Sequence, residues 1–201
     1  MAAEAPPRAG SATDTRQRFI DVAVRLFTRH SFAGTSLQMI ADEVGVTKAA
    51  VYHHFHTREE LLNAVVEPLR ADLRIVIETA ETQRGPHARA EHMLTGYTDL
   101  AVRNRALISV LAADPGVIEM LRADNDMSRL IDRQVKLLAD VDPGPAGLVK
   151  AALVLAGIAG AAGPTLVDLD DDVLRRYLIE AGRRTLGLRT PRRPARDTPP
   201  R

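Results

Sequence analysis

Apolar residues recur with the 3.6-residue period of a helix along almost all of the 201-residue chain, and no run alternates as a strand would. The clearest stripe runs from Phe19 through Ala23 to Phe27 and places its apolar side chains on one helical face. With 45% hydrophobic residues the chain can bury a core, so global disorder is excluded. The sequence therefore predicts an all-α fold of about nine helices.

Turn and capping residues divide the periodic stretches into separate helices. Gly34 and Gly45 end the first two helices, and Thr47 opens a short third one. The fourth helix begins near Thr57, and we expect Pro68 to kink it. From the fourth onward, the helices are expected over residues 57–84, 87–103, 104–112, 116–140, 146–163 and 170–187.

The stretch 146–163 is apolar on every side, so it must be covered on every side. Lys150, several glycines and the acidic run that follows argue against a membrane span. In a chain of this size, such a helix belongs to the core, to a subunit interface, or to both. We therefore expect a homodimer joined through 146–163 and 170–187.

The segment 36–55 is typical of two short helices joined by a tight turn, the helix-turn-helix arrangement. Ala41 is small where the helices cross, and Gly45 can adopt the positive φ that ends the first helix at once. Thr47 caps the second helix, whose free amides suit a phosphate or a major-groove edge. This pattern predicts binding to double-stranded DNA.

The outward side chains around this segment carry the chemistry of DNA contacts. Lys48 can reach a phosphate or a guanine edge. Tyr52 and His53 end in hydrogen-bonding groups at the radius of the DNA backbone. Arg58 heads the next helix, where we expect a flanking phosphate.

Residues from about Arg16 to Leu62 resemble the N-terminal domain of the tetracycline-repressor-like (TetR) family of bacterial transcription regulators. The matching motifs are Gly34-Thr35-Ser36, Ile40-Ala41, Val44-Gly45-Val46, Val51-Tyr52-His53-His54-Phe55 and Thr57-Arg58-Glu59-Glu60-Leu61-Leu62. The resemblance implies a homodimeric repressor that leaves its operator when a small molecule binds the C-terminal domain. It also implies DNA contacts at Thr35, Ser36, Thr47, Lys48, Ala49, Tyr52, His53 and Arg58. Alanine at both 49 and 50 departs from the common family pattern, so base preference does not follow.

These observations divide the chain into four parts. They are a disordered N-terminus (1–12), a helix-turn-helix domain (13–60), a ligand-binding and dimerisation domain (61–187) and a disordered Arg/Pro tail (188–201). In the third part we expect a pocket that mixes apolar surface with a few polar groups. Its candidate lining residues are His92, Met93, Tyr97, Leu107, Val110 and Met120.

Several functional classes are disfavoured by missing motifs. The chain contains no cysteine, which excludes disulfides and cysteine-ligated zinc, and the histidines at 53 and 56 lack further ligands. No nucleophile elbow or Gly-rich phosphate loop accompanies the remaining polar residues, so we expect neither an enzyme nor a cofactor. Residues 1–12 lack the apolar core of a secretory signal, which favours the cytoplasm. The alternative is a helical interaction protein of the same fold that binds DNA weakly.

Overall fold

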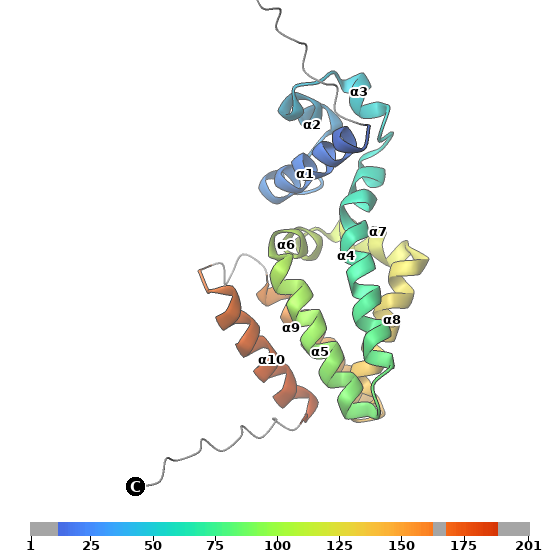
Figure 1. Cartoon of the computed structure of the whole chain (residues 1–201), viewed down its shortest axis with the longest axis vertical. Coiled ribbons are helices and arrows are strands. Elements are labelled where there is room, and N and C mark those ends of the chain that lie inside the picture. Colours follow the sequence, from blue (N-terminus) through green and yellow to red (C-terminus); the bar gives the residue numbers. More distant parts are fainter. Residues whose placement is uncertain (1–11, 163–167, 189–201) are drawn as a thin grey trace, which may run out of the picture.

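The computed structural model describes residues 12–162 and 168–188, and every regular element within these ranges is an α-helix. The all-α prediction is confirmed, with ten helices in the described ranges where about nine were expected (Figure 1). The helices are α1 (Ala12–His30), α2 (Leu37–Val44), α3 (Lys48–Tyr52), α4 (Arg58–Glu81), α5 (Pro86–Arg103), α6 (Arg105–Ala113), α7 (Pro115–Ala123), α8 (Asn125–Ala139), α9 (Pro145–Ala161) and α10 (Asp171–Leu186). The tails expected over 1–12 and 188–201 lie outside the described residues, apart from Ala12, which begins α1, and Leu188, which is buried.

The helix expected over 116–140 is two helices, so this prediction was wrong. α7 and α8 are separated at Asp124, whose backbone is extended with φ −73° and ψ 112°. The Asp124 carboxylate caps α8 by accepting hydrogen bonds from the N–H groups of Asp126 and Met127 at 2.8 and 2.9 Å. The available sequence signal was the Asp-Asn-Asp run at 124–126, because such side chains compete for backbone hydrogen bonds inside a helix.

α1, α2 and α3 form a small bundle at one end of the molecule (Figure 1). The rings of Phe19, Phe27 and Phe55 are at most 1% exposed, so the apolar stripe of α1 faces inward as its spacing predicts. α3 ends at Tyr52, which leaves Phe55 in the connection to α4 and not on the helix where it was expected. Phe55 is buried all the same, and its ring centroid lies 6.5 Å from that of Phe19 on α1.

α4 links this bundle to the larger helical body (Figure 1). It packs against α1 near its start and against α5 and α8 further along, and it continues through Pro68. α5 contacts α10, α8 contacts α9, and α6 contacts α1 where the body meets the bundle. The buried apolar residues of both ends belong to one contiguous cluster, so a shift of α4 is felt at both ends.

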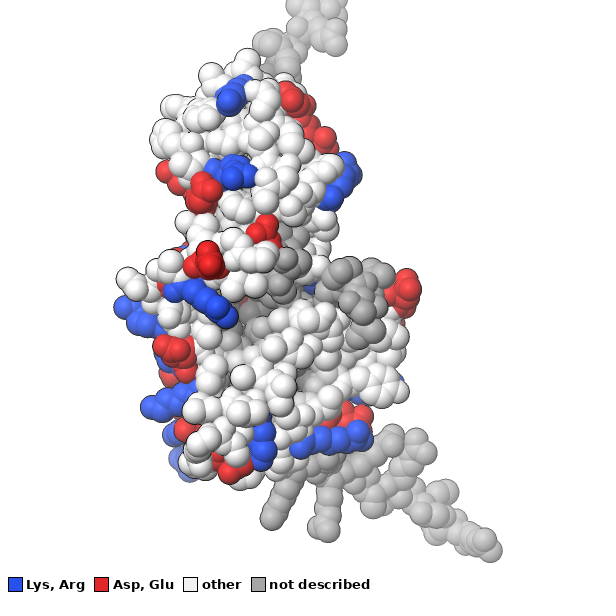
Figure 2. All heavy atoms as spheres, turned by 180° about the vertical axis from the view of Figure 1, so that it is seen from behind, with Lys and Arg blue, Asp and Glu red and all other residues white. Residues whose placement is uncertain are grey.

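α9 is covered on one side by its own chain and open on the other. Ala151, Val154 and Ile158 are buried against the core. Leu148, Val149 and Leu153 are between 53% and 62% exposed, so the complete covering expected for this helix is absent from the single described chain. α9 lies behind α5 in Figure 1, and the view from behind in Figure 2 shows a broad uncharged area across the body. No helix in the described ranges is both long and apolar enough to cross a membrane.

α10 is fixed against α5 by two ion pairs, Arg175 with Asp99 and Arg183 with Glu91. Its outward side carries Tyr177, which is 56% exposed. We call Leu148, Val149 and Leu153 of α9, together with Tyr177 of α10, the α9–α10 apolar surface. Exposed large apolar side chains of this number on neighbouring helices are typical of an interaction surface.

Candidate functional site

The corner between α2 and α3 is built by capping interactions that act over a few residues of chain. The Ser36 hydroxyl caps α2, accepting a hydrogen bond from a backbone N–H of its first turn at 3.2 Å. Gly45 ends α2 with φ +78°, and its N–H donates to the carbonyl of Ala41 at 3.0 Å. Thr47 then caps α3 in the same way as Ser36 caps α2. Gly45, Val46 and Thr47 alone therefore separate the two helices.

α3 has one buried face and one exposed face. Val51 is fully buried, whereas Lys48, Ala49 and Tyr52 are exposed, as is His53 directly after the helix. The Lys48 ammonium lies 5.4 Å from the centroid of the Tyr52 ring, a cation–π contact that keeps the charge on the exposed side. This face can donate hydrogen bonds from an ammonium, a phenol and an imidazole.

Five of the eight expected DNA contacts surround one hollow of about 480 Å³ beside α3. Ser36 lines it from the start of α2, and its hydroxyl proton is free to donate because the cap uses only the oxygen as acceptor. Lys48 and Tyr52 line it from α3. Thr35 and Arg58 complete the five, while Thr47, Ala49 and His53 are exposed outside it.

Thr35 does not face solvent, contrary to what a DNA contact through its side chain requires. It is 1% exposed, and its hydroxyl donates to the carbonyl of Ser31 at 2.8 Å. Its N–H donates to the carbonyl of Phe32 at 3.2 Å, so both of its donors are engaged inside the protein. Thr35 therefore stabilises the turn before α2.

Arg58, which was expected to contact a flanking phosphate, has one guanidinium nitrogen engaged inside the protein. Its Nη1 donates to the carbonyls of Phe32, Ala33 and Thr35 at 3.3, 3.1 and 3.1 Å. Its guanidinium also lies 5.1 Å from the centroid of the Phe32 ring. One side chain at the first residue of α4 thus holds the turn between α1 and α2, and sequence reasoning missed this because the partners lie 23–26 residues away.

Asp114, at the junction of α6 and α7, joins the helical body to the same turn. One carboxylate oxygen caps α7 by accepting from the N–H of Gly116 at 3.0 Å, and the other accepts from the N–H of Ala33 at 3.2 Å. The local signal was an aspartate before Pro-Gly, which predicts a cap but not a partner 81 residues away. The turn over residues 31–35 is therefore held both by α4 and by the α6–α7 junction.

Two arginines on α4 pair with the start of α8. Arg70, which is 9% exposed, contacts Asp124 at 3.0 Å, and Arg74 contacts Asp126 at 2.6 Å. Hydrogen bonding from the Met127 N–H, with the nearby charge of Arg70, lowers the pKa of Asp124 below its ordinary value. Because Arg70 is buried, this pairing opposes a change in the distance between α4 and α8.

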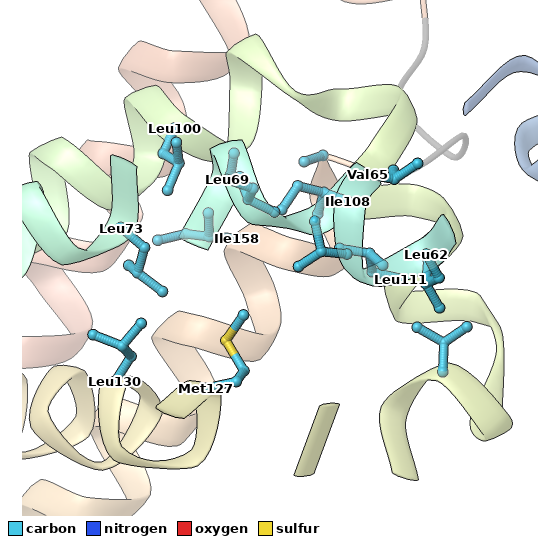
Figure 3. Packing of buried hydrophobic residues seen from close by; sticks show 14 of the residues in the cluster. Leu62, Val65, Leu69, Leu73, Leu100, Ile108, Leu111, Met127, Leu130 and Ile158 are labelled. Carbon is cyan, nitrogen blue, oxygen red and sulfur yellow. The ribbon is translucent and has the colours of Figure 1, made fainter. Parts of the chain in front are cut away.

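A cavity of about 190 Å³ lies in the body between α4, α5, α6, α7, α8 and α9. Figure 3 shows apolar side chains from several of these helices meeting in this part of the core, among them Leu69, Leu73 and Leu100. Its lining residues are Leu69, Leu73, Tyr97, Leu100, Ile108, Leu111, Leu121, Met127, Ile131, Gln134 and Ala159. Of these, sequence reasoning named only Tyr97.

Four of the other five expected pocket residues are not among the described residues that line this cavity. His92 is exposed, and Met93 is fully buried in the core. Leu107 and Met120 are partly buried and adjacent in sequence to the true lining residues of α6 and α7. The Val110 side chain lies outside the described residues. The candidates lie on α5, α6 and α7, three of the six helices around the cavity. A one-residue error within such a helix turns a side chain by about 100° around the axis.

No cluster of three or more His, Cys, Asp or Glu side chains suited to a metal ion occurs in the described part of the chain.

Residues 19–65 match the family model described as bacterial regulatory proteins, tetR family. Over 56 residues the chain is 43% identical to the HTH-type transcriptional regulator AcrR of Shigella flexneri. This matched stretch is 28% of this chain and 26% of that protein. Over 105 residues it is 31% identical to the probable acrEF/envCD operon repressor of Escherichia coli K12, covering 50% and 48%. The chain thus matches less than half the length of these relatives.

Solved structures resemble nearly the whole chain. A bacterial regulatory protein in the tetR family from Rhodococcus RHA1 superposes with a TM-score of 0.66 at 18% identity, covering 90% of this chain and 100% of that one. Mycobacterium smegmatis AmtR superposes with a TM-score of 0.65 at 23% identity, covering 92% of each chain. At these identities the likeness concerns the fold alone. Residues 19–65 thus match the tetR family of bacterial regulatory proteins, and the fold of the chain resembles that of solved structures from this family.

Proposed function

We propose that this protein is a homodimeric transcriptional repressor that binds operator DNA and leaves it when a small molecule binds the helical body. The observation that carries the proposal is the two-faced α3, with Val51 buried and Lys48, Ala49 and Tyr52 exposed after a capped, tight turn. The matched regulator of Shigella flexneri and the probable operon repressor of Escherichia coli support the same class. Such a regulator acts in the cytoplasm, where bacterial DNA lies.

In this proposal α3 enters the major groove with its exposed face. Lys48 binds a phosphate or a guanine edge, and the Ala49 methyl group contacts a thymine methyl. Hydroxyl, phenol and imidazole groups bind the flanking phosphates. These groups belong to Ser36, Thr47, Tyr52 and His53. Thr35 and Arg58 act indirectly, because they hold the turn from which α2 and Ser36 project.

The α9–α10 apolar surface supports dimerisation. In a single chain, Leu148, Val149 and Leu153 of α9 are more than half exposed. The exposed residues that follow them on the same helix are alanine and glycine. Cβ atoms built at Gly157 and Gly160 meet nothing within 4 Å, so the backbone of a second helix can approach closely there. Two copies joined through this surface present two α3 helices to two half-sites about 34–36 Å apart, or near multiples of that.

Release from DNA follows from the position of α4 between the two functional parts. The helix-turn-helix part, residues 13–60, and the ligand-binding and dimerisation part, residues 61–187, share this helix across their boundary. α4 lines the cavity with Leu69 and Leu73 and holds the DNA-binding turn with Arg58. A ligand that prefers one position of α4 changes the separation of the two α3 helices, and so changes operator affinity.

The test starts from the full chain and a random library of double-stranded DNA. After selection, binding to the enriched sequence is measured by fluorescence anisotropy over a series of salt concentrations. We expect an inverted repeat with one half-site for each protomer. Lys48→Ala weakens binding and lowers the slope of log affinity against log salt by about one per protomer, because a phosphate contact is lost.

Lys136→Ala is the matched control, because Lys136 is an exposed lysine on α8, far from α3 in the chain. It leaves affinity and salt slope at the wild-type values. If the library yields no enriched sequence, or if both lysine variants behave alike, the DNA-binding surface proposed for α3 is wrong. The chain would then be a helical interaction protein of the same fold.

A further inference from the structure

The cavity in the body has an almost wholly apolar wall. Nine of the eleven described residues that line it are leucine, isoleucine, methionine or alanine, and none of the eleven has a side chain that is ionised at neutral pH. The two polar exceptions are Tyr97 on α5 and Gln134 on α8. An apolar wall without a counter-charge disfavours an ionised ligand, because the ion would lose its hydration without compensation.

Gln134 is the unusual group in this wall. It is 4% exposed, and its Nε2 has no hydrogen-bond partner among the residues that the structure describes. Buried amide groups are almost always hydrogen-bonded, since a buried donor without a partner costs free energy. The Nε2 atom is closed off in this conformation, whereas the residue lines the cavity, so a turn of the amide brings the donor toward the cavity, where a ligand can supply the acceptor.

Tyr97 adds a second hydrogen-bonding group to the same cavity. Burial raises the pKa of Tyr97 to about 12, so the phenol stays protonated and uncharged at neutral pH. Its hydroxyl is therefore available as a donor. A carbonyl oxygen has two lone pairs and can accept from the amide of Gln134 and from the hydroxyl of Tyr97 together.

We infer that the effector is a compact, uncharged, mainly apolar molecule with a carbonyl oxygen that accepts hydrogen bonds from Gln134 and Tyr97. The inference rests on the proposed function, since it names the class of ligand that acts at the same cavity. The volume agrees with this class, because an apolar cavity of about 150 Å³ can hold benzene and this one measures about 190 Å³. A ligand of this size fills the space between Leu69 and Leu73 of α4 and Met127 of α8.

Three probes of similar size separate the terms of this inference. Acetophenone carries the carbonyl, ethylbenzene has nearly the same shape without it, and benzoate carries a charge. Binding of each to the full chain is measured by isothermal titration calorimetry without DNA. We expect acetophenone to bind about tenfold more tightly than ethylbenzene, and benzoate to bind more weakly than either.

The variant Gln134→Leu keeps the side chain large and apolar but removes the amide. It is expected to reduce the preference for acetophenone over ethylbenzene to about twofold, with ethylbenzene binding retained. Gln17→Leu, which changes an exposed glutamine on α1, keeps the wild-type preference. Tyr97→Phe, which removes only the hydroxyl, gives a second and independent reduction of the preference.

Equal binding of acetophenone and ethylbenzene by the wild type overturns the inference, as does tighter binding of benzoate. An unchanged preference in Gln134→Leu also overturns it. Should Gln134→Leu fail to fold by circular dichroism, Tyr97→Phe and the wild-type series still decide. Because these measurements contain no DNA, they are independent of the operator assay, so failure of the ligand class and failure of the repressor function are told apart.

Discussion

Shortening Leu153 to alanine is the most direct perturbation of the proposed dimer. Leu153 lies on α9 and is 62% exposed in the single chain. Ile75, on α4, is 61% exposed and lies outside the α9–α10 apolar surface. Leu153→Ala and Ile75→Ala therefore remove similar amounts of exposed apolar surface from two different places, and neither opens a cavity in the folded monomer.

The size of the effect follows from the exposed fraction of Leu153. Leu→Ala removes three carbon groups, each worth about 0.8 kcal/mol when fully transferred from water to an apolar environment. Since 62% of the residue is exposed before association, covering it completely makes this difference worth about 1.5 kcal/mol per protomer. A symmetric dimer contains two copies, so Leu153→Ala costs about 3 kcal/mol, or about a hundredfold in the dimer dissociation constant.

Sedimentation velocity over a concentration series gives the dissociation constant of each variant, and chemical denaturation at low protein concentration checks that the monomer is intact. We expect a weaker dimer for Leu153→Ala and a wild-type dimer for Ile75→Ala. Operator affinity measured below the new dissociation constant falls as well, because a monomer reads only one half-site. A monomeric wild type at micromolar concentration, or equal dissociation constants for both variants, refutes the proposed interface.

The structure also predicts the outcome of three other changes. Arg58→Ala removes a charged donor shared by three carbonyls and should lower the free energy of unfolding, measured by urea denaturation, by about 2 kcal/mol. Unchanged stability, together with a slope of log operator affinity against log salt that is lower by one unit, would indicate a phosphate contact instead. Because the pKa of Asp124 is lowered in the folded state, its carboxylate stabilises the fold at pH values above the ordinary carboxyl pKa of 3.8, and this stability is lost as the pH falls through the folded-state pKa. The difference in melting temperature between wild type and Asp124→Asn should therefore shrink below about pH 4. Gly147→Ala should lower the melting temperature sharply, because a Cβ there overlaps backbone carbonyl oxygens. A Cβ at position 157 meets nothing within 4 Å, so Gly157→Ala should stabilise the isolated monomer by up to about 1 kcal/mol, and similar melting temperatures for the two variants would contradict the packing of α9.

Local sequence was sufficient for the helical content of this protein and for the corner that positions α3. The caps at Ser36 and Thr47 and the positive φ of Gly45 are interactions between residues at most four positions apart. Such interactions depend on residue type and spacing alone, so they can be predicted without knowing where the rest of the chain lies. The break at Asp124 belongs to the same class, and its signal was present but was outweighed by the long apolar period around it.

The assignment of each polar side chain was decided by tertiary structure. Arg58 has the charge of a phosphate contact, yet its Nη1 donates to carbonyls more than 20 residues away. Tyr97 and Gln134 line the same cavity only because α5 and α8 pack together. Periodicity defines the inward face of a helix within about one residue, which suffices for a core but not for a pocket. The sequence alone therefore determined the helices and their caps. Only the packing of those helices decided which side-chain hydrogen-bond donors remain free, because the groups that engage a donor can be distant along the chain.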